Sequence, residues 1–156
     1  MKRAVTVILT VVILLMLSGC CFRIDTERIV EKYDGFVEWI AHFQITRDCK
    51  LIGERRYGSD HYIGSYTADC RSECGRDVIF GGASVKQRKI KLSVSVLAED
   101  GSATVRIRLG ADVEEHEFTS NGFIEKELTL SGGSYIMLDY DNFSGTVALT
   151  SEYITG

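Results

Sequence analysis

The sequence contains no proline, a single tryptophan and only three histidines among its 156 residues. The absence of proline excludes proline-rich linkers and polyproline II ligand segments, because both depend on that residue. His42, His61 and His116 are scattered, and neither a Gly-x-Ser-x-Gly elbow nor a family-type Cys-His pair occurs. Since the chain offers no convergent acid, base or nucleophile, we expect a protein that is not an enzyme and uses no cofactor.

The amino terminus has the layout of a secretory signal peptide. Lys2 and Arg3 precede an apolar run over residues 4–17, and the small residues Ser18 and Gly19 follow it. The run of 14 residues is shorter than the roughly 20 that a helix needs to cross a bilayer. A cleaved signal peptide over residues 1–19 is therefore favoured over a retained transmembrane anchor.

The end of this leader, Leu17-Ser18-Gly19-Cys20, resembles the lipobox of bacterial lipoproteins. The resemblance implies that the Cys20 thiol receives a diacylglyceryl group and that the chain is cut before this residue. Two acyl chains on one residue form a stable membrane anchor, whereas a single chain binds only marginally. We therefore expect a lipoprotein of the cell membrane, anchored on the extracytoplasmic side. The alternative is an ordinary signal peptide with a cysteine near the cut by chance.

Without the leader, the chain keeps 16 basic and 22 acidic side chains, a net charge of −6. That sign argues against nucleic acid as a partner, and against a surface that lies flat on anionic lipid headgroups. Residues 20–35 are charged and lack strict alternation, which predicts a lipidated tether or a short helix. Residues 36–45 fit either period, and their alternation favours a strand with Trp39 in the core.

From His61 onward, short runs of alternating apolar and polar residues are separated by glycine-containing turns. Turn signals about every ten residues are typical of a sandwich or barrel and not of βαβ units. We predict an all-β fold, an antiparallel, jelly-roll-like β-sandwich of about eight or nine strands over residues 36–156. The predicted strands from His61 onward are 61–70, 77–85, 89–98, 103–109, 114–119, 123–130, 134–140 and 146–154. The predicted core comprises Val94, Val96, Val105, Ile107, Leu109, Leu128, Leu130, Ile136, Leu138, Val147 and Leu149.

Three local signals predict how these strands connect. Asp100-Gly101 and Asn121-Gly122 are of the dipeptide type that closes tight hairpins, so each is expected to join the strands on its two sides. A weak echo at a shift of 70 residues places Gly75 over Gly145, each after a polar loop. Both glycines are expected to adopt a positive φ there.

The remaining candidate site residues are cysteines and acidic residues. Cys70 and Cys74 are close enough to bridge across a turn, which would leave Cys21 and Cys49 over. The cysteine spacing matches no common zinc pattern. Asp139, Asp141 and Asn142 could supply oxygen ligands to Ca²⁺, and a plain Asx-type turn is the favoured alternative.

Tyrosines in strand or turn contexts complete the candidates, because an exposed ring on a sandwich face can stack on sugars or peptides. The β portion looks broadly like jelly-roll sandwiches of the carbohydrate-binding type and like small envelope lipoproteins, on strand count and pattern alone. We therefore expect a binding or interaction module at the cell envelope, with an envelope glycan or a protein as partner. A structural lipoprotein without a small ligand is the alternative. The tyrosines are Tyr57, Tyr62, Tyr66, Tyr135, Tyr140 and Tyr153.

Overall fold

The computed structural model describes residues 44–154. A short 3-10 turn, η1 (Asp48–Lys50), precedes four strands, which are β1 (Glu54–Tyr57), β2 (Gly64–Leu109), β3 (Asp112–Phe118) and β4 (Gly122–Tyr153). No helix within this part of the chain is long and apolar enough to cross a membrane. The expected all-β class is confirmed.

Several predictions fall outside residues 44–154 and stay predictions. They are the signal peptide over residues 1–19, the lipidated Cys20 and the tether over residues 20–35. Most of the predicted strand over 36–45 lies there as well. Its two described residues, Gln44 and Ile45, are in a turn and a bend.

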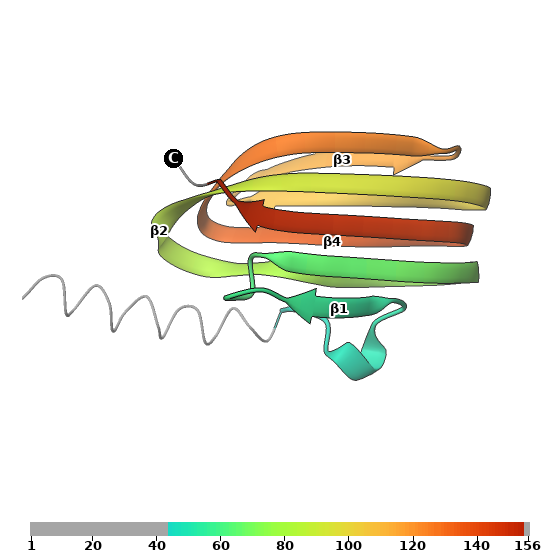
Figure 1. Cartoon of the computed structure of the whole chain (residues 1–156), viewed down its shortest axis with the longest axis horizontal. Coiled ribbons are helices and arrows are strands. Elements are labelled where there is room, and N and C mark those ends of the chain that lie inside the picture. Colours follow the sequence, from blue (N-terminus) through green and yellow to red (C-terminus); the bar gives the residue numbers. More distant parts are fainter. Residues whose placement is uncertain (1–43, 155–156) are drawn as a thin grey trace, which may run out of the picture. The chain divides into compact units, whose positions relative to one another are not determined.

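The strands are fewer and longer than predicted. β1 pairs with β2, β2 with β3 and β2 with β4, always antiparallel. β2 and β4 each turn back on themselves, so that one hydrogen-bonded sheet forms a front layer and a back layer (Figure 1). The backbone keeps its ladder pairs through most of the bends, which is why runs expected as separate strands merge. Those that merge into β2 or β4 are 61–70 for the most part, 77–85, 89–98, 103–109, 123–130, 134–140 and 146–154.

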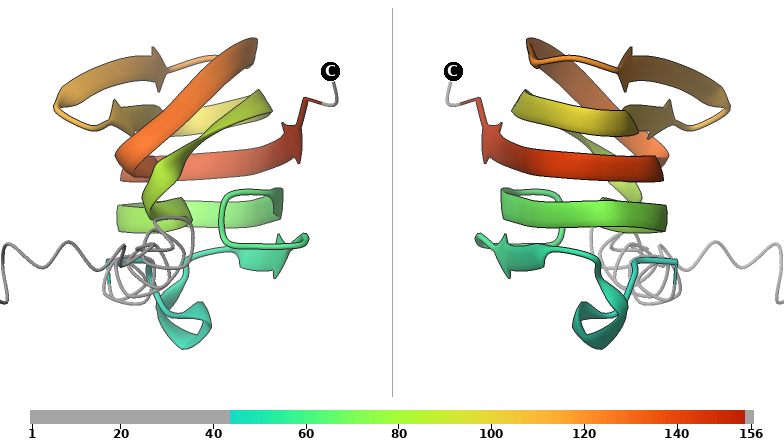
Figure 2. Two further views of the ribbon diagram at one scale, coloured as in Figure 1. Left: turned by 90° about the vertical axis from the view of Figure 1, so that its left-hand side faces the viewer. Right: turned by 90° about the vertical axis from the view of Figure 1, so that its right-hand side faces the viewer.

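The front layer is built around residues 145–153 of β4. They pair on one side with residues 64–70 of β2 and on the other with residues 90–98. β1 continues the layer beyond residues 64–70, and residues 122–128 continue it beyond 90–98. Figure 2 shows β1 below the first part of β2, with the end of β4 next to it.

The back layer is built in the same way around residues 134–141 of β4. These residues pair with residues 75–84 of β2 on one side and with residues 102–109 on the other. β3 continues the layer beyond 102–109. The two layers therefore alternate along the chain, and most consecutive segments lie in different layers.

Two of the corners between the layers share one backbone conformation. Ser72 and Asn142 have φ angles of 55° and 49°, and Gly75 and Gly145 have φ angles of 147° and 139°. The corners contact each other, because the Ser72 amide donates to the Ser144 hydroxyl at 3.0 Å. The expected positive φ of Gly75 and Gly145 is confirmed, and these residues supply a conformation that side chains with a Cβ rarely adopt.

The hairpin predicted at Asp100-Gly101 is wrong. Residues 90–98 and 102–109 lie in different layers and pair with different parts of β4. Gly101 has the positive φ of 70° that its turn signal implies, and its amide bonds to the Asp100 carboxylate at 2.9 Å. The dipeptide bends the chain correctly, but the bend carries the chain across to the other layer.

The hairpin predicted at Asn121-Gly122 is wrong for the same reason. Within residues 44–154, β3 pairs only with β2. The Asn121 side chain instead accepts a hydrogen bond from the Ala98 amide at 2.9 Å, across the gap between segments. A tight hairpin does form at Gly110, where φ is 64° and Leu109 pairs with Asp112.

The hydrophobic core lies between the layers and takes residues from both. Every predicted core residue is buried except Leu109, which is half-buried and packs against the core. Full burial of a valine, leucine or isoleucine side chain contributes about 1.5–3 kcal/mol. The strict alternation that allowed these residues to be identified is thus also what holds the layers together.

Candidate functional site

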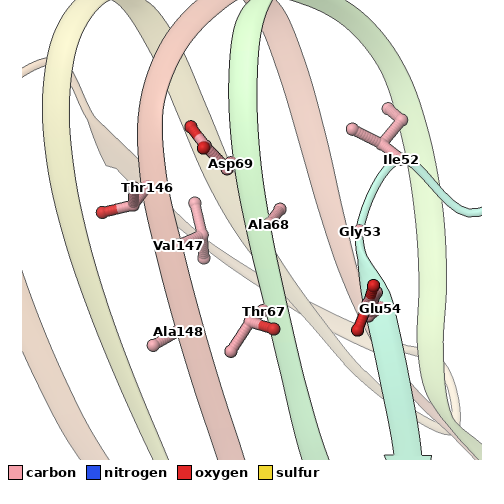
Figure 3. Close-up of a pocket in the computed structure, with 9 residues that line it drawn as sticks. All are labelled: Ile52, Gly53, Glu54, Thr67, Ala68, Asp69, Thr146, Val147 and Ala148. Atoms are coloured by element: carbon pink, nitrogen blue, oxygen red, sulfur yellow. The ribbon is translucent and has the colours of Figure 1, made fainter.

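A depression with a volume of about 530 Å³ lies on the front layer, near the end where the chain crosses between the layers. Its walls come from β1 and the residues before it, from the first part of β2 and from the last part of β4 (Figure 3). The lining residues are Ile52, Gly53, Glu54, Thr67, Ala68, Asp69, Thr146, Val147 and Ala148.

Pairing register brings the polar lining residues together. Glu54 lies opposite Thr67 in one ladder, and Thr67 lies opposite Ala148 in the next. Asp69 lies opposite Thr146 one side-chain repeat further along. All of them are exposed, because successive side chains of a strand point to opposite faces and the residues between them face the core. Rigid, hydrogen-bonded backbone therefore holds every one of these groups in position.

The chemistry of the depression is that of hydrogen-bond acceptors. Within residues 44–154, the carboxylates of Glu54 and Asp69 have no hydrogen-bond or ion-pair partner. Ionised carboxylates only accept hydrogen bonds, whereas the Thr67 and Thr146 hydroxyls can donate or accept. The arrangement suits a ligand that presents donors, such as hydroxyl or ammonium groups.

One wall of the depression is fixed from the back layer. The Ile52 amide donates to Oδ2 of Asp77 at 2.9 Å, and the Gly53 amide lies 3.5 Å from the same oxygen. Gly53 also passes close to the front layer, where a Cβ would lie 2.4 Å from the Thr67 carbonyl oxygen and 2.6 Å from Cζ of Tyr66. Only glycine fits there, so the wall is positioned by a close backbone approach and a buried carboxylate.

Asp77 is itself part of a buried network. It is 1% exposed, and the Tyr66 hydroxyl donates to its Oδ2 at 2.6 Å. The Tyr140 hydroxyl lies 2.9 Å from that of Tyr66. Burial raises the pKa of Tyr66, with Tyr140 and Asp77 adding to the effect, and burial also raises the pKa of Tyr140. Both phenols therefore stay neutral and remain able to donate.

The tyrosines do not form an exposed platform. Tyr62, Tyr66, Tyr135 and Tyr140 are buried, and Tyr57 and Tyr153 are half-buried. The expectation that exposed rings stack on a ligand is thus wrong for these six residues, because their rings fill the core and the edges of the layers.

The expected Ca²⁺ ligands are not assembled as a site. Asp139 is bound by Arg76, with a contact of 2.8 Å between Nη2 and Oδ2, and Nε of Arg106 lies 3.2 Å from the same oxygen. Asn142 forms the corner described above, and no group of three or more acidic, histidine or cysteine side chains gathers within residues 44–154. Two guanidinium groups neutralise Asp139, which leaves Asp141 without the partner carboxylate that the calcium hypothesis requires.

The Cys70–Cys74 disulfide is not formed, and the described cysteines Cys49, Cys70 and Cys74 are free. The positive φ of Ser72 and the register shifts around it separate the two thiols, so that Cys70 is buried and Cys74 is exposed. Sγ of Cys74 instead accepts a hydrogen bond from the Asn142 amide at 3.2 Å. Burial, reinforced by nearby Glu73, raises the pKa of Cys70 to about 11.

Sequence reasoning missed the residues of the depression and the carboxylate behind it. Alternation within the predicted strand 61–70 places Thr67 and Asp69 on the same face, and that signal was present. The sequence did not reveal that Thr146, far along the chain, pairs beside them. Asp77 resembled a polar residue at the start of a strand, and its partners are distant in sequence.

No protein-family model matches the chain, and no curated protein does. Solved structures that are similar to it include PirA, with 10% identity, a TM-score of 0.44 and coverage of 62% of this chain and 98% of that chain. Another is the PRD1 vertex protein P5, with 10% identity, a TM-score of 0.41 and coverage of 65% and 94%. A carbohydrate-binding module of Cellvibrio mixtus lichenase 5A, in complex with cellotriose, has 13% identity, a TM-score of 0.37 and coverage of 67% and 88%. These values assign neither a family nor a ligand to this chain.

Proposed function

We propose that this chain is a binding module, held at the extracytoplasmic face of the cell membrane by a lipid on Cys20. The depression on the front layer is the observation that carries the binding role. It combines unpartnered carboxylates of Glu54 and Asp69 with the hydroxyls of Thr67 and Thr146, all on paired strands. A site built on strands keeps its geometry without a ligand, so little ordering cost opposes binding.

The ligand class follows from the acceptors. A hydroxyl-rich glycan, above all one with ammonium groups, presents the donors that two carboxylates and two threonines can bind. An acidic glycan would place like charges together and be rejected. The alternative, a structural lipoprotein without a small ligand, would leave the depression empty under all conditions.

We also propose that the two layers form a jelly-roll sandwich. Each layer surrounds one segment of β4 with two segments of β2, and consecutive segments alternate between layers except at the Gly110 hairpin. Such alternation is what a double Greek-key connection produces. Selective proteolysis and hydrogen exchange should show one cooperative unit, because the core between the layers is shared.

A thermal-shift titration tests the binding role. Chitosan oligosaccharides, neutral cello-oligosaccharides, alginate oligosaccharides and Ca²⁺ are added separately, and a ligand at 100 times its Kd should stabilise the fold by about 2.7 kcal/mol. We expect chitosan oligosaccharides to give the largest shift. Asp69→Asn with Glu54→Gln should abolish it, whereas Asp112→Asn, on exposed β3, should not. Silence from every addition would reject the small-ligand role and favour the structural alternative.

The anchor has its own test. Cys20→Ala should abolish incorporation of labelled fatty acid and leave the protein uncleaved or released from the membrane. The conversion of Cys21 to alanine is the matched control and should leave acylation unchanged. Continued acylation of the Cys20→Ala variant would contradict the lipid anchor without bearing on the depression.

A further inference from the structure

The back layer carries a small apolar cluster on the face that points away from the core. Ile136 and Leu138 belong to the main core, so the residues that alternate with them, Tyr135 and Met137, face outward. Tyr135 and Met137 are nevertheless only 6% and 8% exposed. With the partly buried Val78 and Ala83 that pack against them, they form what we call the back-face cluster.

Neighbours within the layer do not account for this burial. Val78 lies directly beside Met137 in the ladder, and Arg106 lies on its other side. Residues beside one another in a sheet cover each other's flanks and leave the outward ends open to solvent. A tyrosine and a methionine as buried as these therefore need an element that lies over the layer.

The described chain begins at the border of this cluster. The Thr46 amide donates to the Val78 carbonyl oxygen at 3.1 Å, and the Val78 amide donates to Oγ1 of Thr46 at 2.8 Å. Nη2 of Arg55 donates to the Thr46 carbonyl oxygen at 2.7 Å, and Ile45 is 6% exposed. Three hydrogen bonds thus fix Thr46 against the cluster, and the residues that precede it start from that border.

We propose that residues 36–43 of this same chain dock on the back-face cluster. Their sequence, Phe-Val-Glu-Trp-Ile-Ala-His-Phe, is almost wholly apolar, which matches the chemistry of Tyr135 and Met137. Neighbouring strands lie about 4.8 Å apart, and eight residues span about 12 Å even at the rise of an α-helix. The segment is long enough to cover both strands of the cluster in any regular conformation.

This inference goes beyond the binding role, because it determines how far the body can stand from the membrane. With residues 36–43 docked, only residues 20–35 remain as a tether. At about 3.5 Å per residue they reach at most about 55 Å. The depression and the docked segment belong to different layers, so either proposal can fail alone.

Trp39 is the single tryptophan of the chain, which makes its fluorescence a direct reporter of docking. The full chain in detergent is compared with Met137→Lys and with the control Phe123→Lys, which alters an exposed side chain of the front layer. We expect Met137→Lys to shift the Trp39 emission to longer wavelength and to increase its quenching by acrylamide. Phe123→Lys should change neither. Unchanged emission and quenching in a folded Met137→Lys variant would overturn the proposal.

The reciprocal measurement does not depend on the folding of that variant. Replacement of Trp39 by glutamate should uncover Met137, so that peroxide oxidises it severalfold faster, as followed by peptide mapping. An unchanged oxidation rate would overturn the proposal. Protection of Met137 that is lost on dilution, together with dimers in light scattering, would also overturn it and identify a second copy as the cover.

Discussion

The space between the two layers has an apolar part and a polar part, and they are held together by different means. In the apolar part Val94, Ile107 and Leu138 are at most 1% exposed and contact only other apolar groups. In the polar part Asp77 binds the Tyr66 hydroxyl and the Ile52 amide. Apolar packing tolerates many side chains of suitable volume. A hydrogen-bonded network does not, because each member leaves another unsatisfied when it is lost.

The largest effect is expected in the apolar part. Ile107→Asp would place a charge where no partner exists, at a cost that approaches the whole stability of a domain, about 10 kcal/mol. The variant should lose its cooperative thermal transition in circular dichroism. Arg108→Ala, the next residue on the opposite face, should melt close to the parent. A normal transition for Ile107→Asp would contradict the burial of that face.

A smaller loss is expected in the polar part. Asp77→Ala leaves the Ile52 amide and the Tyr66 hydroxyl without their acceptor, which should lower the free energy of unfolding by about 3 kcal/mol. Asp77→Asn keeps one acceptor oxygen and should cost less. Urea denaturation measures both. Equal losses for the two variants would show that volume matters here and hydrogen bonding does not.

The smallest effect concerns alkaline pH. Burial, with Asp60 adding to it, raises the pKa of Tyr153 to about 12, and burial also raises the pKa of Tyr66 and Tyr140. A raised folded pKa means that stability is complete below the unfolded value of about 10 and is lost as the pH rises through the folded value. Half-buried Tyr153 should contribute about 1 kcal/mol after solvent screening.

Urea midpoints between pH 8 and pH 12 measure this loss. Tyr153→Phe should flatten part of the decline above pH 10 and leave the rest, which belongs to the buried phenols and to Cys70. A stability that rises above pH 10 would contradict the sign worked out for these groups.

The same division explains how much could be predicted from the sequence. Alternation of apolar and polar residues identified Val94 and Ile107 as core, because a strand of period two shows its buried face in the sequence alone. Gly75 and Gly145 were recognised as bends for a similarly local reason. Local signals suffice wherever the structure is determined by neighbouring residues.

The connections and the site depend on which segments meet, and no local signal contains that. Asp100-Gly101 bends the chain as expected, but the layer that the next segment joins is decided by packing across the whole body. Asp69 and Thr146 become neighbours only through the pairing of β2 with β4. Asp77 gains its importance from Ile52 and Tyr66, which precede it by many residues.

One further consequence belongs to Arg55, whose side chain is 3% exposed. Its Nη1 donates to the carbonyl oxygens of Val78 and Ile79 at 3.2 and 2.8 Å, along the border of the back layer. An unpaired border of a sheet is a template on which another chain can add a strand and begin to aggregate. Where these carbonyl oxygens are already bonded, a second molecule finds no free register to copy. Many copies of this protein can thus crowd together with that border closed to self-assembly.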